Sequence, residues 1–245
     1  MGCFFMTVFI TGASRGIGRC LVEEFARLGH SVGFCWLNSD SKAYELIDSL
    51  KKEGCSVVGF KADVSNKEQL CAAIAEAEKK LGAIDLLINN AGIAQSKLFT
   101  DITNEDWDRM FDINVKGVFN AIQAVLPSML NRKSGKIINI SSMWGVVGAS
   151  TEVHYSASKA AVIGLTKALA KELGPSGIAV NCIAPGVIDT DINAFLTESD
   201  IDDIIESTPL GKIGTPKDIA RLAVFLSGDS FITGQIITAD GGFTL

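Results

Sequence analysis

The stretch Val8-Phe9-Ile10-Thr11-Gly12-Ala13-Ser14-Arg15-Gly16-Ile17-Gly18 joins an apolar run to a glycine-rich turn and then to an amphipathic segment. This order is typical of a buried strand, a tight turn and a helix. Glycines in such a turn let the backbone approach a pyrophosphate, which the free N–H groups at the start of the helix attract. The spacing differs from the general G-x-G-x-x-G form, so the stretch indicates a nucleotide site only where the rest of the chain supports it.

Outward from this unit, short apolar runs alternate with longer amphipathic runs. Such strands, separated by helices, indicate a parallel sheet that is covered on both faces. The sequence therefore predicts an α/β fold in which residues 1–245 form one Rossmann-type, doubly wound parallel sheet of about seven strands with helices on both faces. The expected strands are residues 5–10, 31–36, 56–61, 86–89, 136–140, 179–184 and 235–238. The expected helices are residues 17–28, 41–53, 67–81, 105–131, 153–173 and 216–226.

The composition excludes several classes of protein. The net charge of −6 comes with no basic run, which argues against a nucleic-acid binder. The six cysteines are scattered and only two histidines are present, so no metal site is expected. No stretch is long enough to span a membrane, and the apolar N-terminus lacks the basic residues of a leader. The six scattered cysteines suggest a reducing setting, so we expect a cytoplasmic protein.

Tyr155 and Lys159 stand one helical turn apart, downstream of Ser142. Residues at positions i and i+4 share one face of a helix, so the ammonium group can lie beside the phenol. A neighbouring cation favours the phenolate, and we therefore expect Lys159 to lower the pKa of Tyr155. A tyrosine adjusted in this way can exchange a proton with an alcohol or a carbonyl oxygen.

Together with the glycine turn, these residues resemble the short-chain dehydrogenases/reductases over essentially the whole chain. The resemblance rests on seven motifs in the same order: Thr11-Gly12-x-x-x-Gly16-Ile17-Gly18, Asp63-Val64, Asn89-Asn90-Ala91-Gly92, Asn114, Ser142, Tyr155-x-x-x-Lys159 and Pro185-Gly186.

The resemblance implies four catalytic residues. Ser142 would polarise the substrate carbonyl, and Tyr155 would donate the proton as hydride arrives. Lys159 would lower the pKa of the tyrosine and hold the nicotinamide ribose. Asn114 would support a water relay from Lys159 to solvent.

The same resemblance implies a set of cofactor-binding residues along the carboxyl edge of the sheet. They are Gly12, Ser14, Arg15, Gly16, Ile17, Gly18, Asn38, Asp63, Val64, Asn90, Ala91, Gly92, Tyr155, Lys159, Pro185, Gly186, Ile188 and Thr190.

The residues after the second strand favour NADP(H) as the cofactor. An acid at that position would bind the ribose 2′-OH of NAD and repel a 2′-phosphate, but the first acid here is Asp40. Arg15 in the glycine turn can pair with the phosphate. A second arginine near Asn38, frequent in relatives that use NADPH, is missing from this sequence.

Within the family, the segment from Pro209 to Gly214 and the ending from Ile232 to Phe243 most resemble 3-oxoacyl-[acyl-carrier-protein] reductases of fatty-acid synthesis. The expected substrate-binding residues are Ser142, Trp144, Glu152 and Tyr155. An acyl carrier protein is acidic, and basic side chains on two long helices would dock it: Arg109, Lys116, Arg132, Lys133 and Lys171.

An alternative comes from Ser141-Ser142-Met143-Trp144-Gly145 and from Glu152, which resemble enzymes that reduce the 5-aminopentanone modification of elongation factor P. Glu152 would then pair with the substrate amine. A non-catalytic dinucleotide-binding regulator is a further alternative, which the presence of both Tyr155 and Lys159 disfavours.

Three expectations concern larger features. Residues 189–214 follow a strand end and are polar, so we expect a lid of one or two short helices over the site. The two longest helices are apolar enough to pair with other copies, which predicts a homotetramer. His154 is expected to be a partly exposed residue at a helix start and not a general base.

Overall fold

The computed structural model describes residues 5–193 and 196–245. Residues 1–4 of the N-terminal run and residues 194–195 of the expected lid lie outside the described residues. The first strand, β1 (Thr7–Thr11), begins two residues later than expected. The Met6 N–H donates to His30 Nδ1 and the Thr7 N–H donates to the Asp85 carboxylate. Side chains therefore accept the hydrogen bonds of the backbone N–H groups at the start of the strand.

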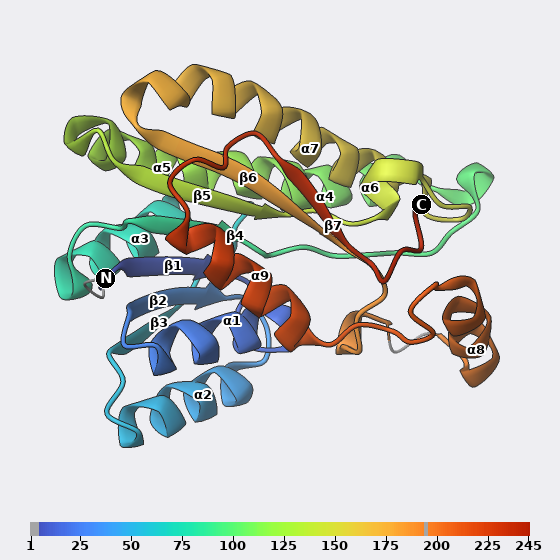
Figure 1. Cartoon of the computed structure of the whole chain (residues 1–245), viewed down its shortest axis with the longest axis horizontal. Coiled ribbons are helices and arrows are strands. Elements are labelled where there is room, and N and C mark those ends of the chain that lie inside the picture. The colour runs from blue at the N-terminus through green and yellow to red at the C-terminus, as the bar shows by residue number, and fades with distance from the viewer. Residues whose placement is uncertain (1–4, 194–195) are drawn as a thin grey trace.

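The sheet has seven strands, as predicted, in the order β3-β2-β1-β4-β5-β6-β7, and each pair of neighbours is parallel. The chain therefore starts in the middle, builds outward to β3, returns to β4 beside β1, and then builds outward to β7 (Figure 1). The remaining strands are β2 (Ser31–Trp36), β3 (Val57–Lys61), β4 (Leu86–Asn89), β5 (Gly135–Ile140), β6 (Ile178–Pro185) and β7 (Ile236–Ala239).

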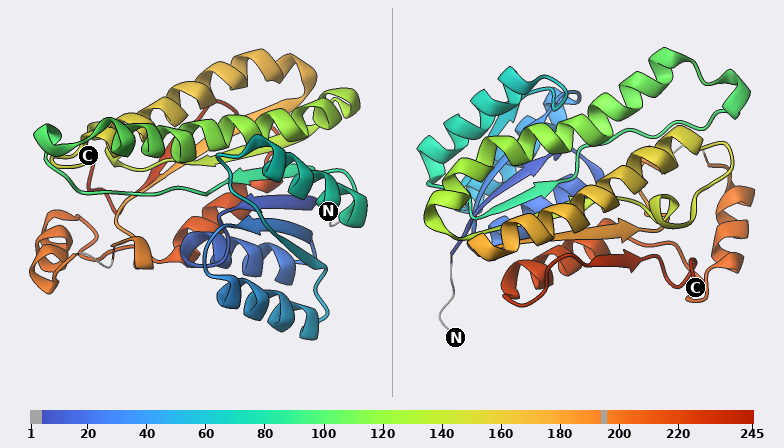
Figure 2. Two further views of the ribbon diagram at one scale, coloured as in Figure 1. Left: turned by 180° about the vertical axis from the view of Figure 1, so that it is seen from behind. Right: turned by 90° about the horizontal axis from the view of Figure 1, so that it is seen from above.

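Helices cover both faces of this sheet, which confirms the expected three-layer fold (Figures 1 and 2). The helices α1 (Gly16–Arg27), α2 (Asp40–Lys52) and α9 (Pro216–Gly228) supply the apolar side chains of one core cluster. The other cluster takes its side chains from α3 (Lys67–Leu81), α5 (Gly117–Arg132) and α7 (Val153–Leu173). Within the described residues, no helix is both long enough and apolar enough to cross a membrane.

The prediction of one unbroken helix over residues 105–131 is wrong, because a π-helical turn divides this stretch into two helices. Helix α4 (Asn104–Phe111) starts at a capping box, in which the Thr103 hydroxyl and the Asp106 carboxylate each bond the other residue's backbone N–H. The π-helical turn η2 (Asp112–Lys116) follows and leads into α5 without a break in the backbone. One extra residue in a turn rotates the side chains that follow it, and such turns occur frequently at functional sites.

The segment 189–214 leaves the sheet and returns to the same place. The Asp189 N–H donates to the Gly214 carbonyl at 2.9 Å, and the Gly214 N–H donates to the Val187 carbonyl at 2.9 Å. Between these ends lie the short 3-10 turn η4 (Asp191–Asn193) and the helix α8 (Glu198–Ser207), which stands apart from the sheet in Figure 1. The structure thus has two short helices in this segment, where one or two were expected, and the two ends of the segment are held together.

Candidate active site

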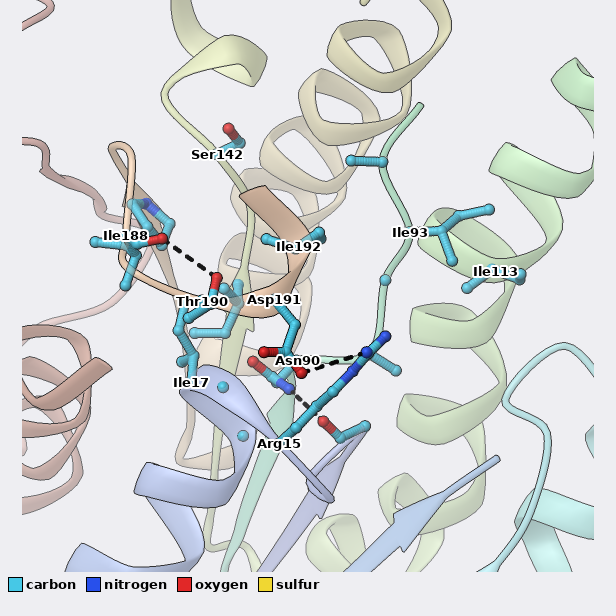
Figure 3. A pocket seen from close by; sticks show the side chains of 18 of the residues that line it. Arg15, Ile17, Asn90, Ile93, Ile113, Ser142, Ile188, Thr190, Asp191 and Ile192 are labelled. Carbon is cyan, nitrogen blue, oxygen red and sulfur yellow. Dashed lines mark hydrogen bonds and ion pairs between the residues drawn. The ribbon is translucent and has the colours of Figure 1, made fainter. Parts of the chain in front are cut away.

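A cavity of about 490 Å³ lies at the carboxyl edge of the sheet. Residues that directly follow β1, β4, β5 and β6 line it, and the strand order reverses between β1 and β4 at this point. Open parallel sheets bind ligands at such a switch point. Figure 3 shows the cavity, with the start of α1 below it and the turn η4 above it.

The glycine turn forms one wall of the cavity, and two of its glycines have no room for a side chain. Gly12 has a φ of +67°, and a Cβ there would lie 2.6 Å from Ala91 Cα. A Cβ on Gly18 would clash with the Gly12 carbonyl oxygen. Helix α1 starts at Gly16 with no side-chain cap and no acid in its first turn, so its first N–H groups are available to an anion. This wall fits the pyrophosphate of a dinucleotide.

Hydrogen bonds between β1 and the loop after β4 fix the shape of this wall. The backbone N–H groups of Asn90 and Ala91 both donate to Thr11 Oγ1 at 3.1 Å. In return, Asn90 Nδ2 donates to the carbonyls of Thr11 and Gly12 at 3.0 and 2.9 Å. The two motifs predicted separately from the sequence therefore form one unit.

The far end of the cavity is lined by Ser142, Tyr155 and Lys159, which the sequence predicted as a cluster. Ser142 follows β5, and the other two residues lie on the first two turns of α7. Lys159 Nζ lies 5.8 Å from the centre of the Tyr155 ring and donates to the Ile140 carbonyl at 3.0 Å. The ammonium group therefore lies over the ring of the tyrosine.

The expected lowering of the Tyr155 pKa is wrong for this arrangement. Burial raises the pKa of Tyr155 to about 12, and the hydrogen bond with Ser142, which lowers it, does not compensate. Burial also lowers the pKa of Lys159 to about 8. Desolvation disfavours the charged form of each group, and Lys159 is not among the groups that shift the pKa of Tyr155.

Asn114 does not line the cavity but lies buried behind it, in the π-helical turn. Its amide exchanges two hydrogen bonds with the backbone of Ile93, and Nδ2 also donates to Ser158 Oγ at 3.0 Å. A Cβ on Gly92 would lie 3.2 Å from both Asn114 Oδ1 and Lys159 Nζ. Gly92 therefore leaves a narrow space between the amide and the ammonium group.

The residues after β6 close the side of the cavity nearest the segment 189–214. A Cβ on Gly186 would lie 2.7 Å from Asp240 Cα, so this strand end requires a residue without a side chain. The Thr190 hydroxyl and Asn193 Nδ2 both donate to the Ile188 carbonyl, at 3.2 and 2.8 Å. Ile188 and Thr190 line the cavity, as expected (Figure 3).

Trp144 and Glu152 form the part of the wall beside the tyrosine. The Trp144 ring meets Phe243 edge-on, with the ring centres 5.5 Å apart. Burial raises the pKa of Glu152, and its charge in turn raises the pKa of Tyr155. The structure thus places a carboxyl group close to the phenol.

The end of the cavity beside β2 and β3 contains Asn38, Asp63 and Val64, which were expected to bind the cofactor. Ser14 Oγ donates to the Asn38 carbonyl at 3.3 Å. The Asp63 carboxylate accepts hydrogen bonds from the backbone N–H and the hydroxyl of Ser65, at 2.9 and 2.7 Å. These bonds connect the glycine turn to β2 and fix the loop after β3.

The structure brings every predicted site residue to the cavity except Asn114, and it adds others that sequence reasoning missed. The added residues lie close to predicted ones in the chain or in the turn η4: Trp36, Leu37, Ala62, Ile93, Ala94, Ile113, Ile140, Ser141, Met143, Val187, Asp191, Ile192 and Asn193. Proximity to the motifs was the available signal for most of them, and Ile192 and Asn193 had none.

Arg109, predicted to dock a carrier protein, is exposed and also lines the cavity, so its docking role stays a prediction. His154 differs from expectation. His154 is fully buried in the first turn of α7, and its Nε2 lies 2.9 Å from Gln95 Oε1. His154 is therefore a packed residue of the catalytic helix and not an exposed one, because the loop that contains Gln95 covers it.

Comparison with known proteins identifies the family. A family model described as short chain dehydrogenase matches residues 6–200. The chain belongs to the short-chain dehydrogenase family. As a short-chain dehydrogenase, it is an oxidoreductase that acts on the alcohol/carbonyl couple with a nicotinamide dinucleotide.

Similar proteins of this family include enzymes and solved complexes. The 3-oxoacyl-[acyl-carrier-protein] reductase FabG of Staphylococcus aureus is 40% identical over 96% of this chain and 97% of that protein. A blue fluorescent protein from a metagenomic library, solved in complex with NADPH, has a TM-score of 0.92 and 35% identity, covering 98% of both chains. A 3-oxoacyl-[acyl-carrier protein] reductase from Brucella melitensis with bound NAD has a TM-score of 0.88 and 35% identity, covering 98% of this chain and 91% of the other.

Proposed function

We propose that this short-chain dehydrogenase uses NADPH to reduce 3-oxoacyl-[acyl-carrier-protein] to the 3-hydroxyacyl form. The observation that carries the proposal is the cluster of Ser142, Tyr155 and Lys159 at the end of a cavity that fits a dinucleotide. The full-length similarity to a 3-oxoacyl-[acyl-carrier-protein] reductase supports the choice of substrate.

The state of the cluster suits reduction. When bound, a nicotinamide dinucleotide supplies the hydride that reduces the carbonyl carbon. Because its pKa is raised to about 12, the Tyr155 phenol is protonated at neutral pH and can donate to the carbonyl oxygen. Ser142 orients and polarises that oxygen. With a pKa of about 8, Lys159 is still mostly cationic at pH 7 and stabilises the negative charge that develops.

The surroundings of β2 support NADPH as the cofactor. Asp40, the first acid after this strand, accepts a hydrogen bond from Trp36 Nε1 at 2.7 Å and one from Lys61 Nζ at 2.7 Å. It is not among the residues that line the cavity, so it does not present a carboxylate to the adenosine ribose. Arg15 lines the cavity and provides a positive charge there.

The position of Glu152 favours a second candidate, reduction of the 5-aminopentanone modification on elongation factor P. An acyl chain has no cation to pair with a half-buried carboxylate beside the reacting carbonyl, whereas an aminoketone has one. Glu152→Gln is expected to weaken reduction of an aminoketone about tenfold or more and to leave thioester reduction nearly unchanged, since a charge-assisted bond contributes roughly 1.5–3 kcal/mol.

Steady-state NADPH oxidation tests both candidates. The substrates are an acetoacetyl thioester on acyl carrier protein and elongation factor P carrying the aminopentanone, with NADH in parallel and Tyr155→Phe as the inactive control. Efficient thioester turnover supports the first proposal. Turnover of the modified factor alone supports the second, and turnover of neither contradicts both.

We also propose that the chain forms a homotetramer through the outer faces of α4, α5 and α7. Phe119 and Leu130 on α5 are 46% and 39% exposed, and Trp107 on α4 is 37% exposed. These apolar side chains form a surface that a second copy can cover. Sedimentation velocity that shows a monomer contradicts this proposal.

For docking an acidic carrier protein, two of the expected cations are engaged within the chain. Lys116 pairs with Asp112 at 3.1 Å, and Arg132 pairs with Asp85 at 2.6 Å. The remaining proposed contacts are Arg109 on α4 and Lys133 and Lys171 at the ends of α5 and α7, and all three are exposed.

A further inference from the structure

The carboxylate of Asp191 faces two cations across the mouth of the cofactor cavity. Its Oδ2 lies 3.0 Å from Lys42 Nζ and 3.5 Å from an Arg15 guanidinium nitrogen. The three residues come from different parts of the chain: the glycine turn, helix α2, and the turn η4 at the start of the lid. In Figure 3, Arg15 extends from the start of α1 toward Asp191.

Lys42 supplies the second cation that the sequence lacked near Asn38. It lies in the first turn of α2, and its ammonium meets the same carboxylate oxygen as Arg15. Two cations that converge on one oxygen beside the uncapped start of α1 form an arrangement that suits a phosphate. The Asp191 carboxylate thus occupies a position suited to a ligand anion.

The ion pairs of Asp191 with the two cations are exposed enough for a ligand anion to replace the carboxylate. The side chains of Arg15, Lys42 and Asp191 are 54%, 48% and 51% exposed, so water and a ligand can reach all three. Lys42, and to a lesser extent Arg15, hold the pKa of Asp191 below its usual range, so the carboxylate is charged at neutral pH. Exposed ion pairs of this kind are individually weak.

We propose that Asp191 is an internal anion that holds the base of the lid on Arg15 and Lys42 until the 2′-phosphate of NADPH takes its place. The proposal rests on the proposed use of NADPH. A phosphate monoester carries about −1.5 to −2 charges at pH 7, whereas the carboxylate carries one, so the two cations favour the exchange. NADH has no 2′-phosphate and leaves the Asp191 contacts in place.

The exchange links the two ends of the site. Asp191 lies two residues after Asp189, whose N–H holds the base of the lid to Gly214. Binding of a phosphate at the adenosine end therefore frees the segment that leads to α8 at the substrate end. By linkage, a substitution that weakens the contacts of Asp191 with the two cations by some factor must tighten binding of the 2′-phosphate by that factor.

Isothermal titration calorimetry with two cofactor fragments tests the exchange without any ketone. The probes are adenosine 2′,5′-bisphosphate and adenosine 5′-monophosphate. Asp191→Asn is expected to tighten binding of the bisphosphate roughly two- to fivefold, and Lys42→Gln to weaken it by a similar factor, the range for an exposed ion pair. Neither substitution is expected to change the affinity for the monophosphate.

Matched controls remove the same charges elsewhere. Asp202→Asn lies on the exposed side of α8, and Lys51→Gln lies at the opposite end of α2 from Lys42. Equal effects of these controls would show a general charge effect and overturn the proposal. Weaker or unchanged bisphosphate binding by Asp191→Asn would also overturn it.

Hydrogen exchange of the α8 amides provides a readout of the lid. The bisphosphate is expected to speed amide exchange over residues 197–207 in the natural chain. In the Asp191→Asn variant, the same amides are expected to exchange fast without any ligand. An unchanged exchange rate, or slower exchange, contradicts release of the lid.

If the bisphosphate binds the natural chain no better than the monophosphate, the NADPH preference itself fails. If it binds better but Asp191→Asn has no effect, only the Asp191 proposal fails.

Discussion

Replacing Thr11 by valine tests how the two nucleotide motifs support one another. Thr11 is 2% exposed, and its hydroxyl oxygen accepts the N–H groups of Asn90 and Ala91. Valine has nearly the same shape but no acceptor, so both N–H groups lose their partner in a loop that is partly buried. Leaving a buried donor unsatisfied costs about 1–3 kcal/mol, and two of them give an expected loss of about 2–4 kcal/mol after partial relaxation.

For a chain of 245 residues, each kcal/mol changes the melting temperature by about 2–4 °C, so Thr11→Val should melt about 5–15 °C lower. Thr11→Ser is the matched control because it keeps the acceptor and loses one methyl group, which contributes about 0.8 kcal/mol. Circular dichroism melts of both variants beside the natural chain measure the difference. A valine variant that melts with or above the serine variant would refute the reasoning that these two bonds hold the loop.

Two further predictions concern the catalytic end of the cavity. Burial lowers the pKa of Lys159 from 10.5 to about 8, so the folded state binds fewer protons than the unfolded state between these values and stability rises with pH in this window. Lys159→Met should therefore melt above the natural chain at pH 7, and the gap should narrow between pH 8 and 10; a constant gap contradicts the burial of a charged lysine. Gly92→Ala places a Cβ 3.2 Å from Asn114 Oδ1 and Lys159 Nζ and should reduce turnover by roughly tenfold or more, because small displacements of reacting groups are costly. Gly174→Ala is the control for Gly92→Ala, because its added Cβ meets no atom within 4 Å. Equal activity of the two variants would show that the added Cβ at position 92 does not crowd Asn114 and Lys159.

The layer structure could be predicted from the sequence because its signals are local. Apolar runs such as Val8 to Ile10 and the turn glycines at Gly29 and Gly54, both with positive φ, mark strand and helix ends without reference to distant residues. The start of α4 also had a local signal in Thr103 and Asp106. The π-helical turn had none, since no glycine or proline marks Asp112–Lys116.

The composition of the site could be predicted, but its electrostatics could not. The spacing of Tyr155 and Lys159 fixes a shared helix face, whereas the direction of each pKa shift depends on burial, which comes from packing of the whole domain. The pairing of Lys42 with Asp191 joins residues 149 positions apart, and no local pattern announces it. Contacts of this kind appear only when the fold brings the two segments together.

The joined ends of segment 189–214 have a consequence for how this enzyme can change. Because Asp189 and Gly214 are hydrogen-bonded to each other, the entropy of closing this loop is compensated at its base and depends only weakly on the loop's length. The segment can therefore be exchanged as a cassette, longer or shorter, while the sheet and the catalytic cluster stay as they are. On the expectation that this segment covers the substrate, a different segment inserted between these two residues would change the substrate and leave the reduction chemistry unchanged.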